Sequence, residues 1–376
     1  MNLALSDEQE FLREAARGAL SRHKTVEAAH AALEDPSALP DLWPTAVEAG
    51  WPGLLIDDEH GGAGLDVFDA LLVAEECGRV LASVPLLGLV PATAILQAAG
   101  DESLQAVAHG EVRPVYLPAR PPSELEPGWT VDPESGMGRA PAPKASVEGD
   151  EVSFVGKVSF VPDAPGADLL VVVGQADDGS TVAGVVEASA DGVSLEPVTL
   201  YDATRPLANI TLSGARARRL DVGQEALTDA WFVAQSLLAA ESLGAVQTCL
   251  ETSVEYAKER FTFGRAIGSY QSIKHELTEV LRLLENARSL EYYAGWARTG
   301  KPEEFALAAS AARTAGSKAL DFGARSMINV HGGIGATWEH DAPLYFRRAQ
   351  LSRRLLGGTH DATDRVAEQA MAGAVA

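Results

Sequence analysis

Apolar residues recur at helical spacing from residue 6 to about residue 110. At the start of this region Phe11, Leu12, Ala15, Ala16 and Leu20 fall at helical spacing, and Ser6 precedes them as an N-cap followed by acidic residues. Further helices are predicted at 38–50, 67–83 and 89–100. A glycine-rich stretch at 51–65 predicts a loop between two of them. We expect an N-terminal helical domain over residues 1–111.

The pattern changes near residue 112 to short β-branched runs separated by prolines and glycines. Strands are predicted at 152–161, 168–174, 180–188 and 207–214. The proline-rich segment 118–144 is expected to form an extended surface loop. Residues 112–223 therefore form the predicted β domain.

Helical periodicity returns after residue 223. The segment 226–261 has no proline, and Ile273, Leu277, Leu281 and Leu284 mark the apolar stripe of the next helix. Helices of this length packed side by side predict a bundle over residues 224–376. The expected fold class is α+β, mostly α, in the order helices, strands, helices.

Charge and cysteine content narrow the function. The net charge of -23 at pH 7 opposes binding to nucleic acid. Cys77 and Cys249 are far apart in apolar contexts, so neither a disulfide nor a cysteine metal site is expected. No run of about 18 apolar residues and no signal peptide is found, which predicts a cytoplasmic protein that does not enter a membrane.

The segment RFTFGRAIGSYQSIKHEL, residues 260–277, joins two long helices. A turn between antiparallel helices would explain Gly264 and Gly268 without any function. Basic residues are nonetheless crowded there in an acidic chain, and they could hold a pyrophosphate. They are Arg260, Arg265, Lys274 and His275.

A second glycine-rich segment, INVHGGIGATWEHDAPLYFRRA, spans residues 328–349. Its glycines could admit a phosphate close to the backbone, and a helix C-cap followed by a loop explains them equally well. His331, Glu339 and His340 lack HExxH spacing, so no metal site is predicted. The chain also has no GxSxG and no strand-linked GxGxxG, which argues against a hydrolase and a Rossmann dehydrogenase.

Together these two segments resemble the R-x-x-F-G-x-x-I-x-x-[FY]-Q-x-x-x-H and Q-x-x-G-G-x-G-x-T-x-E segments of the acyl-CoA dehydrogenase family. Asn329 stands where that family usually has glutamine. The stretches LSDEQ, GLLIDDEHGGAGL, EECGRVLASVPLL and YDATRPLANITLSG are also similar to family segments, so the resemblance spans nearly the whole chain. It implies an N-terminal helical domain, a middle β-barrel-like domain and a C-terminal four-helix bundle.

The resemblance also implies FAD as the cofactor and an acyl-CoA thioester as the substrate. In the family the adenosine diphosphate half of FAD is held by a neighbouring subunit, and electron-transfer flavoprotein is the expected acceptor. Carried over by motif, the residues expected to contact FAD are Arg260, Phe263, Gln271, Asn329, Gly332, Gly333 and Thr359. Arg260 would pair with the pyrophosphate.

The family's catalytic base is the glutamate of a Y-E-G-T segment, and this chain has Gly357 at that position in LLGGT. Some members carry the base on the first bundle helix instead, where this chain has Ala234. Glu241, two turns along on roughly the same face, is a candidate substitute, although a salt bridge within the bundle is its more ordinary role. Asp361 and His360 are further candidates, each more often a solvated polar residue.

The flavin-covering T-E-P-x-x-G-S-D loop of the family is missing between residues 115 and 138, and Phe160 stands where a tryptophan often packs on the flavin. We therefore expect one subunit of a heteromeric, α2β2 acyl-CoA dehydrogenase that completes a homologous partner's FAD site. By analogy such complexes act on bulky thioesters, including steroid side chains. Two alternatives remain: a stand-alone flavoenzyme with a displaced base or oxidase or monooxygenase chemistry, and a catalytically dead scaffold.

Overall fold

The computed structural model describes residues 4–123, 127–135 and 138–375. Its N-terminal part consists of α1 (Asp7–Ser21), α2 (Thr25–Ala31), α3 (Trp43–Glu48), α4 (Val67–Arg79), α5 (Leu86–Ala99) and α6 (Leu104–Ala108). The predicted N-cap is confirmed, because the Ser6 side chain accepts a hydrogen bond from the Gln9 backbone in a capping box. Of the apolar residues at helical spacing, Ala16 and Leu20 are buried, whereas Phe11 is 72% exposed.

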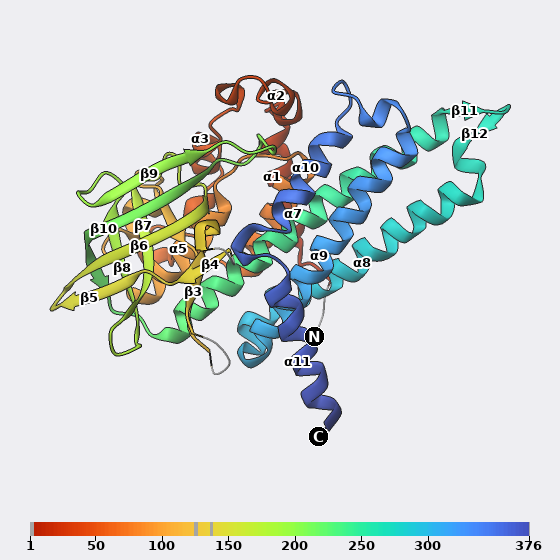
Figure 1. Cartoon of the computed structure of the whole chain (residues 1–376). Coiled ribbons are helices and arrows are strands. Elements are labelled where there is room, and N and C mark those ends of the chain that lie inside the picture. The colour runs from red at the N-terminus through yellow and green to blue at the C-terminus, as the bar shows by residue number, and fades with distance from the viewer. Residues whose placement is uncertain (1–3, 124–126, 136–137, 376) are drawn as a thin grey trace.

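A seven-stranded sheet follows in the middle of the chain. Its strands are β1 (Pro114–Leu117), β5 (Lys144–Glu148), β6 (Glu151–Pro162), β7 (Leu169–Ala176), β8 (Thr181–Glu187), β9 (Val193–Val198) and β10 (Leu207–Leu220). The order is β1-β7-β5-β6-β10-β8, and β8 also pairs with β7. Five strands therefore close into a ring, which gives the sheet its barrel-like form (Figure 1).

The segment predicted as a surface loop instead contributes a small second sheet. It pairs β2 (Ala119–Arg120), β3 (Trp129–Val131) and β4 (Arg139–Pro141). Trp129 and Thr130 are buried, and the Thr130 hydroxyl donates to the Pro118 carbonyl at 2.7 Å. The proline and glycine content of this segment carries no information about strand pairing or about which way a tryptophan within it points.

The C-terminal part is a bundle of long helices, as predicted. It contains α7 (Gln224–Glu259), α8 (Gln271–Gly300), α9 (Pro302–His331), α10 (Ala342–Ser352) and α11 (His360–Val375). Helix α7 runs through the centre, packing against α4, α5, α8 and α9. In the predicted stripe of α8 Leu284 is buried, as expected, but Leu281 is 45% exposed. Val280 and Leu283 are buried in its place.

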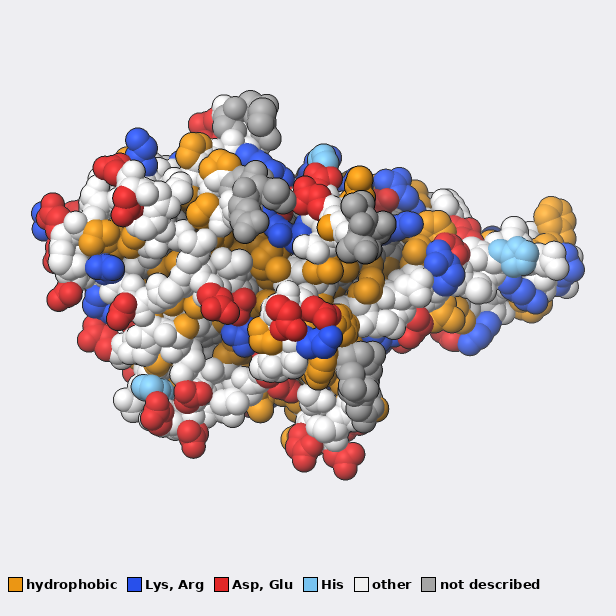
Figure 2. Space-filling model, turned by 90° about the horizontal axis from the view of Figure 1, so that it is seen from below, with side chains coloured by type: hydrophobic (Ala, Val, Ile, Leu, Met, Phe, Trp, Pro, Cys, Tyr) orange, Lys and Arg blue, Asp and Glu red, His pale blue; other side chains and the backbone are white. Residues whose placement is uncertain are grey.

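The α7–α8 hairpin projects from the body of the molecule (Figure 1). Its tip carries the short strands β11 (Phe261–Thr262) and β12 (Arg265–Ala266), and the end of α9 lies beside the start of α8. Figure 2 shows hydrophobic, basic and histidine side chains gathered on a projecting end of the molecule. None of the helices in the described ranges is both long and apolar enough to cross a membrane.

Candidate functional site

Gly357 lies in a tight turn between α10 and α11. The turn is the short 3-10 segment Leu355–Gly357, in which Leu356 has φ +53° and Gly357 has φ +80°. Gly358 follows at φ +84°. Left-handed backbone at three successive residues strongly favours glycine at the second and third. The position at which the family carries its glutamate is thus built as a turn without a side chain.

Two buried side chains, Arg313 and Gln235, donate hydrogen bonds to backbone carbonyls at this turn. The guanidinium of Arg313, on α9, donates to the carbonyls of Ser352 and Leu355, and its Nε donates to Gln235 Oε1 at 3.1 Å. Gln235, on α7, donates in turn to the Leu356 carbonyl at 3.4 Å. Burial lowers the pKa of Arg313 to about 10. Neither residue was predicted from the sequence, because nothing in the helical context of Arg313 or Gln235 distinguishes it from a core position.

Trp129 fills the space beside Gly357. A Cβ atom placed on Gly357 would lie 2.2 Å from Cη2 of the indole. The indole also packs edge-on against Trp231 of α7, with ring centroids 5.1 Å apart, and the Arg139 guanidinium lies 4.2 Å from its ring centroid. The volume into which a residue 357 side chain would extend is therefore already occupied by this chain.

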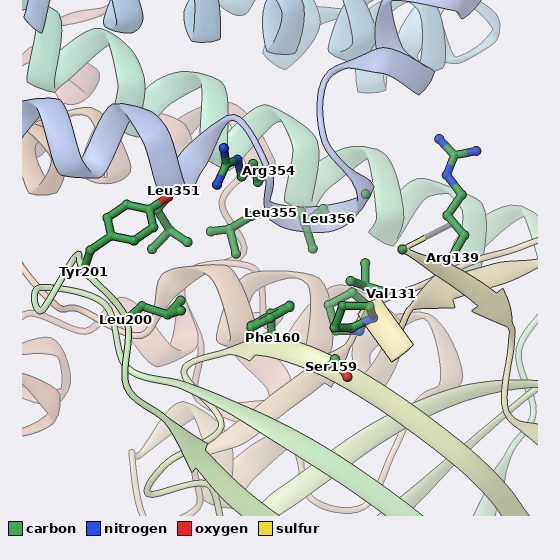
Figure 3. Close-up of a pocket in the computed structure, with 14 residues that line it drawn as sticks. Val131, Arg139, Ser159, Phe160, Leu200, Tyr201, Leu351, Arg354, Leu355 and Leu356 are labelled. Carbon is green, nitrogen blue, oxygen red and sulfur yellow. The ribbon is translucent and has the colours of Figure 1, made fainter. Parts of the chain in front are cut away.

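Gly357 also lines a cavity of about 400 Å³. It is lined by Pro118, Val131, Pro133, Gly138, Arg139, Ser159, Phe160, Leu200, Tyr201, Leu351, Arg354, Leu355, Leu356 and Gly357. Figure 3 shows Leu351, Leu355 and Leu356 pointing from above toward Phe160 and Leu200, while Arg139 extends away from them. The walls are mostly apolar, and the buried Ser159 hydroxyl has no hydrogen-bond partner among the described residues.

The candidate substitute bases do not line this cavity. Glu241 is 5% exposed and forms a buried ion pair with Arg205, which precedes β10 in the middle domain, so its salt bridge leaves the bundle instead of lying within it as expected. Asp361, at the start of α11, pairs with Arg120 of β2, with 3.4 Å between Nε and Oδ2. His360 is exposed and pairs with Asp364. Ala234 is buried in the core around Trp129 and Trp231.

Six of the seven expected FAD contacts lie together at the hairpin tip. Arg260 ends α7 and Gln271 begins α8, and both are exposed. Phe263 is 95% exposed at φ +50°. Asn329, at the end of α9, donates to Glu276 of α8 at 3.3 Å, and Gly332 and Gly333 follow it. Within the described residues the Arg260 guanidinium has no acidic partner, so it is available to a pyrophosphate.

Thr359 is not part of that group. It lies beside the turn, in a groove lined also by Thr314, Ser317, Lys318 and Arg353. Along α7, Gln235 at the turn and Arg260 at the tip are 25 residues apart, which corresponds to about 37 Å at 1.5 Å per residue. This exceeds the length of one extended FAD. The residues at the tip thus fit the phosphate half of FAD, but they cannot bind it together with this chain's own cleft.

Family models match both the N-terminal and the C-terminal part of the chain. Residues 6–109 match the model of the acyl-CoA dehydrogenase N-terminal domain, and residues 233–371 match that of the C-terminal domain. Acyl-CoA dehydrogenase IpdE2 of Mycolicibacterium smegmatis is 32% identical over 357 residues, which cover 94% of this chain and 96% of that protein. FadE34 of Mycobacterium tuberculosis is also 32% identical, over 96% of this chain and 47% of its own length.

Solved structures of acyl-CoA dehydrogenases have the same fold as this chain. A structure described as a variant of the Tcur3481-Tcur3483 steroid ACAD has a TM-score of 0.86 and 27% identity, covering 98% of this chain and 99% of its own. The ChsE4-ChsE5 complex from Mycobacterium tuberculosis has a TM-score of 0.84 at 21% identity, covering 99% of each chain, which shows the shared fold. The chain therefore belongs to the acyl-CoA dehydrogenase family of FAD-dependent oxidoreductases.

Proposed function

We propose that this chain is one subunit of a heteromeric acyl-CoA dehydrogenase, in which a homologous partner supplies the carboxylate base and this chain completes the partner's FAD site. One observation carries the proposal. The position of the base is a glycine closed off by Trp129, whereas the FAD-contacting motif at the hairpin tip is exposed and far from the chain's own cleft.

At the tip, each residue has a physical role to offer. Arg260 presents a guanidinium with the geometry to pair with a pyrophosphate, and the left-handed turn at Gly332 leaves the backbone accessible to phosphate oxygens. Gln271 and Asn329 add amide groups for hydrogen bonding. FAD, once bound, would accept the hydride that leaves the β-carbon of the thioester. This chain's part is to bind and orient the cofactor.

The lost base explains why a partner is required. Without a positioned carboxylate, removal of the α-proton would be slower by about 10²–10⁴-fold. Glu241 and Asp361 are already committed to Arg205 and Arg120. A stand-alone dehydrogenase would have to release one of these ion pairs, whereas a partner with its own glutamate would not.

The names of the relatives support a substrate class. The solved relative at 27% identity is described as a steroid ACAD, and its name gives two proteins, Tcur3481 and Tcur3483. We infer a bulky, steroid-like side-chain thioester of coenzyme A as the substrate of the complex, with electron-transfer flavoprotein as the acceptor.

Purification with and without a co-expressed homologous subunit tests the proposal. We expect the lone chain to be colourless, and the complex to show a flavin spectrum and to desaturate a steroid side-chain CoA thioester. A yellow lone chain that turns over acyl-CoA would favour a stand-alone flavoenzyme. A complex that gains no flavin from this chain would favour a scaffold.

A further inference from the structure

We propose that Trp129 is a built-in plug that excludes an acyl thioester from this chain's own cleft. The inference rests on the proposed function and deepens it, because it says why only the partner's cleft can react. The indole stands between Gly357 of the turn and Trp231 of α7, where a thioester would have to approach a base at residue 357.

Both backbone pairing and side-chain contacts fix the position of Trp129. In the backbone ladder, Trp129 of β3 pairs with Arg120 of β2 and with Pro141 of β4. Around the indole lie Trp231, Arg139 and Gly357, and only 5% of the residue is exposed. Such close packing leaves no alternative position without moving a neighbour.

Trp129 and Gly357 are matched to each other. A Cβ on residue 357 would lie 2.2 Å from Cη2 and 2.6 Å from Cζ3 of the indole, so any side chain there must displace the ring. The glycine is thus required by the tryptophan as well as by its backbone angle of φ +80°. Replacing Gly357 by glutamate alone could therefore not restore the catalytic base.

Removal of the plug would open a path between two existing features. The cavity of about 400 Å³ reaches Gly357, and Trp129 separates that glycine from Trp231. Shortening Trp129 would leave space between Gly357, which lines this cavity, and Trp231 of α7. Trp129 is therefore the side chain that fills the space beside Gly357, and a probe ligand can report on whether that space has been opened.

The first test is a stability cycle on the lone chain with Gly357→Ala, Trp129→Leu and the double variant. Strain from the positive φ acts in both backgrounds, whereas the collision with the indole acts only beside Trp129. We expect Gly357→Ala to lower the thermal midpoint by roughly 2–6 °C in the native background, and by less than half as much when it is added to Trp129→Leu. Equal effects in both backgrounds would overturn the matching of the two residues.

The second test uses butyryl-CoA as the probe in calorimetric titration of the lone chain. We expect no binding to the native chain up to about 1 mM, and measurable binding to Trp129→Ala or, if that variant unfolds, to Trp129→Leu. Binding to the native chain, or no gain in either folded variant, would overturn the plug. Neither test needs flavin or a partner, so a failure here is distinct from a failure of the proposed function, which the flavin spectrum of the complex decides.

Discussion

Asp163 is a buried carboxyl group whose ionisation opposes folding. It is 1% exposed, and burial raises its pKa to about 6, although Arg205 and Arg113 nearby partly offset this effect. The Gly88 N–H donates to its Oδ2 at 2.9 Å. Its backbone is left-handed, at φ +63°, a conformation that asparagine tolerates well. Asp163→Asn therefore removes the charge with little change in shape.

Between about pH 4 and pH 6 the folded chain keeps a proton on Asp163 that the unfolded chain has released. The native protein therefore loses stability as pH rises through this window, and the Asp163→Asn variant lacks that loss. We expect the variant to gain about 2–3 kcal/mol relative to the native protein from pH 4 to pH 7. Urea unfolding at several pH values measures it. The difference should be flat above about pH 7, and a difference independent of pH throughout would contradict the assignment.

Helices α4 and α7 cross at two glycines in direct backbone contact. A Cβ on Gly78 would lie 2.0 Å from the Glu241 carbonyl oxygen, and one on Gly244 would lie 1.8 Å from that of Glu75. Alanine at either position must push the helices apart, which we expect to lower the free energy of unfolding by about 3 kcal/mol or more. Chemical denaturation measures this loss. Gly18→Ala in α1, where nothing lies within 4 Å, is the control and should stabilise by about 0.5–1 kcal/mol.

The same elements show which features of the structure could be predicted from the sequence. The helix–strand–helix order and the Ser6 cap follow from local patterns, and the structure confirms both. The crossing at Gly78 was not predictable, since a glycine inside a helical pattern looks the same whether it meets a backbone or solvent. Trp129 was missed for a related reason. Its partners, Gly357 and Trp231, are brought to it only by tertiary packing.

At the scale of the whole molecule, the cleft around Gly357 and the motif expected to contact FAD lie in different parts of the structure. The cleft lies beside the turn between α10 and α11, and the motif expected to contact FAD lies at the end of the projecting hairpin (Figure 1). Exposed Phe261 and Phe263 at that end leave apolar surface uncovered in the single chain. A second subunit that covers the tip would bury this surface and place its own cofactor beside Arg260.

The decisive variant for this arrangement is Arg260→Ala, assayed in the assembled complex. A charge-assisted pair with pyrophosphate is worth about 1.5–3 kcal/mol, so its loss should weaken FAD binding about tenfold or more. Flavin content after dialysis at increasing salt measures the loss. Lys258→Ala is the matched control, because Lys258 is a neighbouring exposed cation that already donates to Glu255 at 2.6 Å. Equal flavin retention in the two variants would show that the tip does not hold the cofactor, whereas selective loss in Arg260→Ala places the binding energy across the subunit boundary.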